Sequence, residues 1–287
     1  MKKLRVSSPL DLHSNSRENL SEYIRTGLEF HKEIGFDAAD FDMSWLDLSS
    51  DASWRPSVEK ALEDSEKVGL KIEICHLPFI GGGVKDPSFL EKFNEKMHRA
   101  IDAATLLGVS YAVLHPNAPT VSMKSYDRAK QHETVMTHLA PFAEHAARVG
   151  LNIVVENMRV IPTFVASHRY CQSPDELCDV ADALGIGVCW DFGHANISGI
   201  KQSEGIAYVG KRLKVLHVND NAAVDDEHIP PFMGNVNWRD AMHGLALVGF
   251  DGLLNYEIAT DRLPAVVRKA HAKYLIDAAE ELMSYIK

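Results

Sequence analysis

The sequence predicts a parallel α/β barrel of the (β/α)8 or TIM-barrel class, as a single domain over residues 1–287. Short apolar runs alternate with longer amphipathic runs, which is typical of parallel sheets with helical connections. The apolar runs are almost continuous, as in NIVVE and KVLHV, which indicates strands buried on both faces. A doubly wound open sheet is the alternative fold, but no glycine-rich phosphate turn follows the first strand.

About eight strand–helix units follow one another in chain order. We expect strands at residues 4–7, 37–41, 71–76, 111–115, 152–156, 186–191, 213–218 and 253–257. We expect helices at residues 19–34, 57–68, 87–107, 125–149, 174–184, 202–209, 238–248 and 264–285. A glycine directly follows most of these helices, as is typical of a helix end.

Three loops between these elements carry distinctive residues. The loop after the second strand contains Trp45 and Trp54, which either wall a pocket or pack in the core. The loop at 160–173 is long and aromatic, which makes it a candidate lid. The glycine run at 81–83 lacks the G-x-G-x-x-G spacing of a nucleotide-binding turn and indicates a flexible loop.

The composition indicates a globular cytoplasmic protein. Hydrophobic residues make up 46% and charged residues 24% of the chain, which excludes a disordered chain. The net charge of −10 argues against broad electrostatic binding of nucleic acid. Four cysteines without C-x-x-C spacing imply no disulfide framework and fit a reducing compartment. No apolar run approaches membrane-spanning length, so we expect no membrane association.

Ionisable residues stand at or near the ends of six consecutive predicted strands. In chain order they are His76, His115, Glu156, Asp191, His217 and Glu257. The carboxyl ends of all barrel strands open onto one face, where active sites lie. Neighbouring strands are about 4.8 Å apart, so these side chains can converge. A single His or carboxylate at a strand end is often structural or a helix cap, but six in agreement indicate a shared site.

The candidate metal ligands in this set are Glu156, Asp191, His217 and Glu257. Several carboxylates in a partly dry pocket raise each other's pKa, and a divalent cation removes that repulsion. Mixed imidazole and carboxylate ligands suit Mn²⁺, Zn²⁺, Co²⁺ or Fe²⁺ better than Ca²⁺. We therefore expect a divalent metal as the cofactor, with its identity open.

Further polar residues lie close to these positions in the sequence. His194 stands three residues beyond Asp191. Asp226 and His228 lie in the loop after the seventh strand, where they present two ligands from one turn or belong to a solvated acidic loop. Arg159, three residues beyond Glu156, either contacts an anionic substrate or lies at the surface.

Seven short motifs carry a resemblance to a known family. They are HLPF at 76–79, HP at 115–116, VVEN at 154–157, GVCWDFGHA at 187–195, HVND at 217–220, DEHIPPFMGNVNW at 226–238 and YE at 256–257. In this order and at these strand ends, they resemble the xylose-isomerase-like TIM-barrel superfamily. That superfamily contains the sugar (phosphate) isomerases and epimerases and the relatives of endonuclease IV.

The resemblance implies roles for the matched residues. Glu156, Asp191, His217 and Glu257 match the single-metal centre of the ketose epimerases, in which the two glutamates are also the catalytic proton carriers. His194 matches a residue that contacts substrate in those enzymes. After His217, however, the sequence VNDNAAVDDE has no arginine where the ketose 3-epimerases carry one.

The endonuclease IV relatives imply additional metal positions. His76 and His115, together with Glu156, match one further zinc site. His194, Asp226 and His228 match another. In a sugar enzyme we expect His76, His115, His194 and Arg159 to face the substrate instead.

Two enzymatic functions follow as expectations. The first is metal-dependent isomerisation or epimerisation of a sugar, sugar phosphate or related polyol, by proton transfer through an enediolate. The second is endonuclease IV-like hydrolysis of abasic DNA by a trinuclear zinc centre, which the full ligand set favours. The sequences WLDLSSDASWR and FIGGGVKDPS after strands two and three lack an Arg- and Lys-rich segment, so we prefer the sugar enzyme.

A third alternative is a sugar-binding barrel without catalysis. The two intact glutamates, Glu156 and Glu257, argue against it, because binding alone does not need both carboxylates on a metal. The expected partner is therefore a small carbohydrate substrate. The sugar, the choice between isomerase and epimerase, and a homo-oligomeric state stay open.

Overall fold

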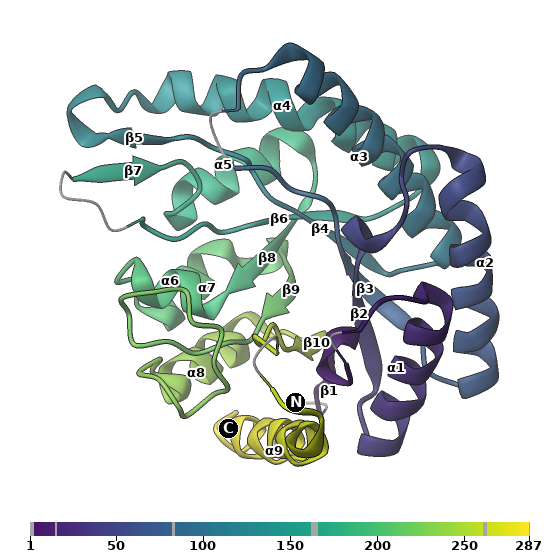
Figure 1. The fold of residues 1–287 in the computed structure, drawn as a ribbon. Coiled ribbons are helices and arrows are strands. Elements are labelled where there is room, and N and C mark those ends of the chain that lie inside the picture. The colour runs from purple at the N-terminus through teal and green to yellow at the C-terminus, as the bar shows by residue number, and fades with distance from the viewer. Residues whose placement is uncertain (1–2, 15, 82–83, 162–165, 261–262, 287) are drawn as a thin grey trace.

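The computed structural model describes residues 3–14, 16–81, 84–161, 166–260 and 263–286 (Figure 1). Its centre is an eight-stranded parallel sheet in the order β10–β1–β2–β3–β4–β6–β8–β9. The strands are β1 (Arg5–Pro9), β2 (Ala38–Asp42), β3 (Ile72–His76), β4 (Tyr111–Leu114), β6 (Ile153–Glu156), β8 (Gly187–Asp191), β9 (Leu213–His217) and β10 (Leu253–Asn255). Each lies within two residues of the boundaries expected from the sequence.

The sheet closes into a barrel between β9 and β10. Val218, directly after β9, forms a parallel bridge with Tyr256. The amide of Val218 donates to the carbonyl of Asn255 over 2.8 Å, and the amide of Glu257 donates to the carbonyl of Val218 over 3.2 Å. The predicted TIM barrel is therefore confirmed.

Helices surround the sheet on its outer side (Figure 1). They are α1 (Leu20–Ile34), α2 (Asp51–Val68), α3 (Pro87–Leu107), α4 (Arg128–Val149), α5 (Pro174–Leu184), α6 (Phe192–Ile197), α7 (Gln202–Val209), α8 (Trp238–Val248) and α9 (Ala265–Ser284). A glycine ends α3 as expected, because Gly108 takes the left-handed conformation at φ 76° and its amide donates back to the carbonyl of Ala104.

The expected start of the second helix is wrong by six residues. The sequence analysis placed it at residue 57, but α2 begins at Asp51 and continues through Pro56. Trp54 holds this first part of the helix, because its ring is 1% exposed and its Nε1 donates to Asp51 Oδ1 over 3.2 Å. Trp54 is therefore a core residue, whereas Trp45 lines a pocket.

A two-stranded antiparallel ribbon, which the sequence analysis did not predict, extends from the barrel rim (Figure 1). Strand β5 (Thr120–Ser122) pairs with β7 (Ser167–Arg169), with Thr120 opposite Arg169. The expected lid at 160–173 contains β7, while Phe164 falls outside the described residues. Tyr170 is fully buried and its hydroxyl lies 2.9 Å from His132 Nδ1.

The apolar core has two parts, one between the sheet and the helices and a smaller one inside the barrel. The inner part takes one residue from most strands: Ala38, Ile74, Val113, Val154, Cys189, Val215 and Leu253. The next residue along each of these strands points outward toward the helices, as the twofold period of a strand requires. The residue after that points inward again, and there the barrel interior becomes polar.

None of the helices in the described ranges is both long and apolar enough to cross a membrane.

Candidate metal centre

The alternation along the strands delivers the candidate residues to one mouth of the barrel. On β6 the inward residue Val154 is followed two positions later by Glu156. Cys189 and Asp191 on β8, and Val215 and His217 on β9, repeat this relation. Each strand thus fills the barrel interior with an apolar side chain and places an ionisable one above it.

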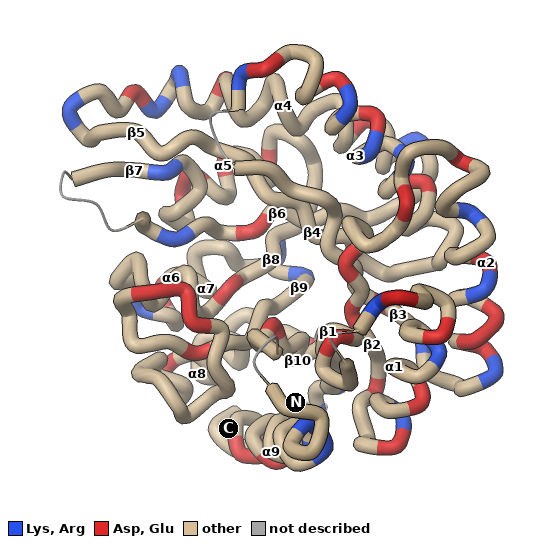
Figure 2. The backbone as a smooth tube through the Cα atoms, in the orientation of Figure 1, with Lys and Arg blue, Asp and Glu red and all other residues tan. Residues whose placement is uncertain are grey.

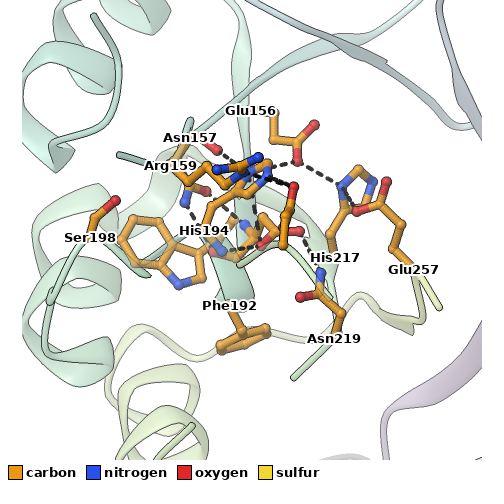
Figure 3. A network of polar contacts seen from close by, with 12 residues as sticks. Glu156, Asn157, Arg159, Phe192, His194, Ser198, His217, Asn219 and Glu257 are labelled. Atoms are coloured by element: carbon orange, nitrogen blue, oxygen red, sulfur yellow. Dashed lines mark hydrogen bonds and ion pairs between the residues drawn. The ribbon is translucent and has the colours of Figure 1, made fainter. Parts of the chain in front are cut away.

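Glu156, Asp191, His217 and Glu257 converge as the sequence analysis expected. One potential ligand atom from each of the four lies within 4.8 Å of the others. His217 Nδ1 lies 3.1 Å from Glu156 Oε1 and 3.1 Å from Glu257 Oε2 (Figure 3). Glu156, Asp191 and His217 are at most 1% exposed, whereas the side chain of Glu257 is 25% exposed. Glu257 is therefore the member of the group that is most open to a bound molecule.

Two further groups of candidate ligands adjoin this one. The first contains His76, Glu156 and His217, and the second contains His194, Asp226 and His228. Asp226 bridges the two histidines of the second group, with an oxygen 3.3 Å from His194 Nε2 and another 3.3 Å from His228 Nε2.

His115 belongs to neither group, but it reaches the same glutamate. Its Nε2 lies 2.9 Å from Glu156 Oε2, and His76 Nε2 lies 3.6 Å from that oxygen. With His115 in contact with Glu156, the structure brings together all nine residues that the sequence analysis singled out as metal ligands.

Neighbouring amides fix the orientation of Asp191. The backbone amide of His194 donates to Asp191 Oδ1 over 2.6 Å, and the side chain of Asn219 donates to Oδ2 over 2.6 Å. Asn157 accepts from the backbone amide of Asp191 over 2.7 Å. Such surrounding hydrogen bonds hold a carboxylate in one orientation and tune its affinity for a metal.

Crowding shifts the pKa values of the carboxylates in opposite directions. Burial, with added repulsion from Glu257 and Glu156, raises the pKa of Asp191 to about 7. Burial also opposes ionisation of Glu257, but His217 and His228 hold the pKa of that carboxyl below its usual range. The site therefore concentrates negative charge that the histidines only partly neutralise.

Most of the histidines in turn favour their charged forms, whereas burial lowers the pKa of His115. Burial acts to lower the pKa of His194, but Asp191 and Asp226 raise it to about 9. For His228, Glu257 and Asp226 outweigh burial and raise the pKa to about 10. A cation among these carboxylates would replace the protons that these side chains otherwise hold.

The residues present fit a divalent metal. Glu156 Oε2, Glu257 Oε2 and His217 Nε2 are buried atoms for which the described residues offer no well-directed hydrogen bond. Buried polar atoms of this kind are costly unless another group satisfies them. Imidazole nitrogens and carboxylate oxygens are the donors that Mn²⁺, Zn²⁺, Co²⁺ and Fe²⁺ accept.

A cavity of about 420 Å³ opens above this group. The candidate residues that line it are His76, His115, Glu156, Arg159, His194, Asp226, His228 and Glu257. Asp191 and His217 do not line it, because they lie fully buried below its floor. Arg159 lies in the pocket wall, where its side chain is 25% exposed and its Nε donates to Asp226 Oδ2 over 3.0 Å.

Several lining residues were missed by the sequence analysis. Asp42 ends β2 and points to the mouth, so the strand-end rule would have found it had it been applied to the second strand. Asp40 lies one inward position deeper, and Asn255 donates to it over 2.8 Å. Arg169 reaches the pocket from the short strand β7 and left no signal in the sequence.

The fold and this site define an α/β barrel with a candidate metal centre at the carboxyl ends of its strands. The profile of the xylose isomerase-like TIM barrel family matches residues 28–284. The chain therefore belongs to this family, which confirms the resemblance carried by the sequence motifs.

Two sequence relatives are uncharacterized proteins. One, from Methanocaldococcus jannaschii, is 26% identical over 247 residues, which cover 83% of this chain and 80% of that protein. The other, from Sinorhizobium fredii, is 24% identical over 183 residues, which cover 62% of this chain and 58% of that protein.

Several solved structures share the fold. A D-allulose 3-epimerase from Methylomonas sp. superposes with a TM-score of 0.75 and 15% identity, covering 98% of this chain and 99% of that chain. A 3-keto-D-glucoside 4-epimerase from E. coli superposes with a TM-score of 0.70 and 16% identity, covering 99% of this chain and 100% of that chain. A D-tagatose 3-epimerase-like protein superposes with a TM-score of 0.70 and 20% identity, covering 98% of this chain and 100% of that chain. At these identities the similarity concerns the fold.

Proposed function

We propose that the protein is a divalent-metal-dependent isomerase or epimerase of a carbohydrate. The observation that carries the proposal is the convergence of Glu156 and Glu257 on His217 Nδ1, each with an oxygen 3.1 Å away. Two carboxylates, one at the end of β6 and one just after β10, thus lie where a single cation could bind both, and both border one pocket. Sugar epimerases are among the structural neighbours, which supports the same class of reaction.

The proposed chemistry moves a proton at a carbon next to a carbonyl. A divalent cation held by Glu156, Asp191, His217 and Glu257 would polarise that carbonyl and acidify the adjacent C–H. Glu257 is the side chain that accepts the proton, because it is partly open to the pocket and its neighbouring histidines keep it ionised. Positioned carboxylates of this kind contribute roughly 10²–10⁴-fold in rate.

Glu156 is the second proton carrier in this proposal. Its side chain lines the pocket and contacts His76, His115, His194 and His217, so imidazoles surround the carboxylate. Burial opposes ionisation of Glu156, but His217 and His115 hold the pKa of this carboxyl well below its usual range. Return of the proton by Glu257 to the neighbouring carbon would give isomerisation, and delivery of a proton by Glu156 to the original carbon from its opposite face would give epimerisation.

Solvent exchange tests the proposal directly. The metal-loaded protein is incubated in D₂O with a panel of ketoses and ketose phosphates, and deuterium at carbon is followed by NMR. We expect incorporation with the wild type and its loss in Glu257→Gln. Glu280→Gln, which alters an exposed glutamate near the end of α9, is the matched control and should exchange normally. Normal exchange in Glu257→Gln would contradict the role of that residue.

One observation favours a second function, phosphodiester hydrolysis at abasic DNA. The candidate ligands form three adjoining groups rather than one, which would suit a multinuclear zinc centre. A nicking assay on abasic duplex DNA with the zinc-loaded protein separates the two functions. Nicking without exchange into any sugar would replace the proposed isomerase by the nuclease.

A further inference from the structure

The ribbon β5–β7 brings an arginine into the pocket from outside the barrel sheet. Arg169 is the last residue of β7, pairs with Thr120 of β5 and lines the cavity. Its backbone amide donates to Gln172 Oε1 over 3.0 Å, and Gln172 Nε2 contacts His168 Nδ1 over 2.9 Å. The backbone that carries Arg169 is therefore braced on both sides.

A buried carboxylate anchors this ribbon to the helices. Glu176 on α5 is 2% exposed and accepts hydrogen bonds from the hydroxyl of Tyr126, from His168 Nε2 over 2.8 Å and from the amide of Cys171 over 3.0 Å. These contacts come from both sides of the ribbon. The position of Arg169 is consequently set by the fold and not by a free loop.

The guanidinium of Arg169 forms no ion pair within the described residues, although Glu156 and Asp226 attract it from a greater distance. Arg159 beside it, by contrast, donates to Asp226 over 3.0 Å. Arg169 is nevertheless half-buried, and burial followed by repulsion from Arg159 lowers its pKa. A half-buried cation without a partner is unfavourable unless a bound anion completes it.

The two sides of the pocket differ in charge. Arg159 and Arg169 follow β6, and Asp11 follows β1, which stands four positions from β6 in the order of the closed sheet. Asp40 and Asp42 on the neighbouring β2 extend the acidic side. Figure 2 shows basic positions on β7 and after β6 and acidic positions around β2, with a further acidic stretch beside α6. Within the pocket, Asp226 pairs with Arg159 and leaves Arg169 as the basic group that no ion pair neutralises among the described residues. A ligand with one anionic end and several hydroxyls would match this distribution.

We propose that the substrate is an anionic carbohydrate whose phosphate or carboxylate group binds Arg169, at the rim opposite the acidic side of the pocket. This inference rests on the proposed function and names the substrate class of the same site. The planar guanidinium presents paired N–H donors that suit both kinds of oxyanion. The hydroxyls of the same molecule would then extend over the candidate metal group toward Asp11 and Asp42.

Binding measurements with matched ligands test this assignment. The metal-loaded protein is titrated calorimetrically with D-fructose, D-fructose 6-phosphate and D-fructuronate, and with D-ribulose and D-ribulose 5-phosphate. We expect the wild type to bind at least one anionic member about 10- to 100-fold more tightly than its neutral counterpart, as a charge-assisted hydrogen bond allows. The phosphate and carboxylate arms identify which oxyanion is preferred.

Variants assign the preference to Arg169. Arg169→Gln should remove the preference for the anionic member, while Arg169→Lys should retain part of it. Arg148→Gln removes the same charge from an exposed position on α4 and should behave as the wild type. Circular dichroism of each variant checks the fold, and Arg169→Lys provides a second reading if Arg169→Gln fails to fold.

Two results would overturn the inference. One is equal affinity of the wild type for neutral and anionic members in every pair. The other is a preference that survives in Arg169→Gln, because the anion would then bind the metal or another group. Neither result depends on turnover, so the deuterium exchange test of the proposed function remains separate. An anionic preference without exchange would leave this subsite standing and refute the isomerase.

Discussion

His31 is a buried histidine on the outer side of the barrel, where it packs against β1. It is 0% exposed, with Nδ1 2.8 Å from the carbonyl of Gly27 and Nε2 2.8 Å from Ser8 Oγ. Nδ1 donates to the carbonyl and Nε2 accepts from the hydroxyl, so the neutral ring satisfies both partners. Burial lowers its pKa to about 4 from the usual 6.5.

This histidine should make the protein less stable in mild acid. The unfolded chain binds a proton at His31 below pH 6.5, and the folded protein binds it only near pH 4. The free energy of unfolding therefore falls as the pH drops through this window, by about 3 kcal/mol from His31. Urea unfolding at pH values between 7.5 and 4.5 measures this loss.

Comparison with His31→Gln isolates the contribution. The variant should be less stable than the wild type at pH 7.5, and the difference should shrink as the pH falls. His243→Gln, at an exposed position on α8, is the control for removal of a histidine. The stability difference from the wild type should depend on pH for His31→Gln and not for His243→Gln. The same pH dependence for both variants would contradict the assignment to His31.

Gly193 shows how one missing side chain shapes the candidate metal site. A Cβ at this position would lie 1.9 Å from Asn219 Oδ1, and Asn219 is the residue that donates to Asp191. Gly193→Ala should therefore displace Asn219 and weaken metal binding about 10- to 100-fold while the fold persists. Competition with a chromogenic chelator measures the affinity.

A double-mutant cycle checks the route of this effect. Asn219→Ala alone should cause a similar loss of metal affinity, and the double variant should lose little more. If the losses of metal affinity in the two single variants add up in the double variant, Gly193→Ala does not act through Asn219.

At the scale of elements, the β5–β7 ribbon depends on Glu176. Replacement by Ala leaves three donors without their acceptor, so the ribbon should open more often. We expect amide hydrogen exchange in β5 and β7 to accelerate at least tenfold, while β6 and β8 stay protected. Glu133→Ala, at an exposed position on α4, should change neither. Unchanged exchange in the ribbon of Glu176→Ala would refute the anchor.

The helices and strands also differ in how well they can be predicted from the sequence. Strands such as β6 and β8 were predicted because continuous apolar runs mark strands buried on both faces. Their final residues were placed correctly because the twofold period sends Glu156 and Asp191 inward. The ribbon was missed because three-residue strands carry no period, and with it Arg169 was missed. The start of α2 was missed because Pro56 argues locally against a helix that the buried Trp54 stabilises.

At the scale of the whole molecule, the candidate metal centre sits where eight strands converge, so its charge affects the stability of the barrel. Without a metal, burial and the neighbouring glutamates raise the pKa of Asp191 to about 7 from 3.8. The unfolded chain releases this proton at lower pH than the folded protein does. The free energy of unfolding therefore falls as the pH rises from about 4 to about 7. Above pH 7, the ionised carboxylate of Asp191 lowers the free energy of unfolding by on the order of 4 kcal/mol.

Asp191→Asn should therefore have opposite effects in the absence and presence of metal. At pH 8 with a chelator, the variant should be more stable than the wild type, because the amide carries no charge. Asn219 can turn its side-chain amide to accept from the new donor, since its Oδ1 lacks a hydrogen bond from the described residues. With Mn²⁺ at about 100 times its dissociation constant, the wild type should gain about 2.7 kcal/mol. The variant should gain much less, because it has lost an anionic ligand.

Urea unfolding in chelator and in Mn²⁺ measures both effects, with Asp251→Asn at an exposed position as the matched control. The control should follow the wild type under both conditions. If Asp191→Asn is less stable than the wild type in chelator, the carboxylates do not repel one another as the structure implies. If it gains as much from Mn²⁺ as the wild type, the cation lies elsewhere. The cluster of buried carboxylates therefore predicts a barrel whose free energy of unfolding is low without a cation and rises when a cation binds.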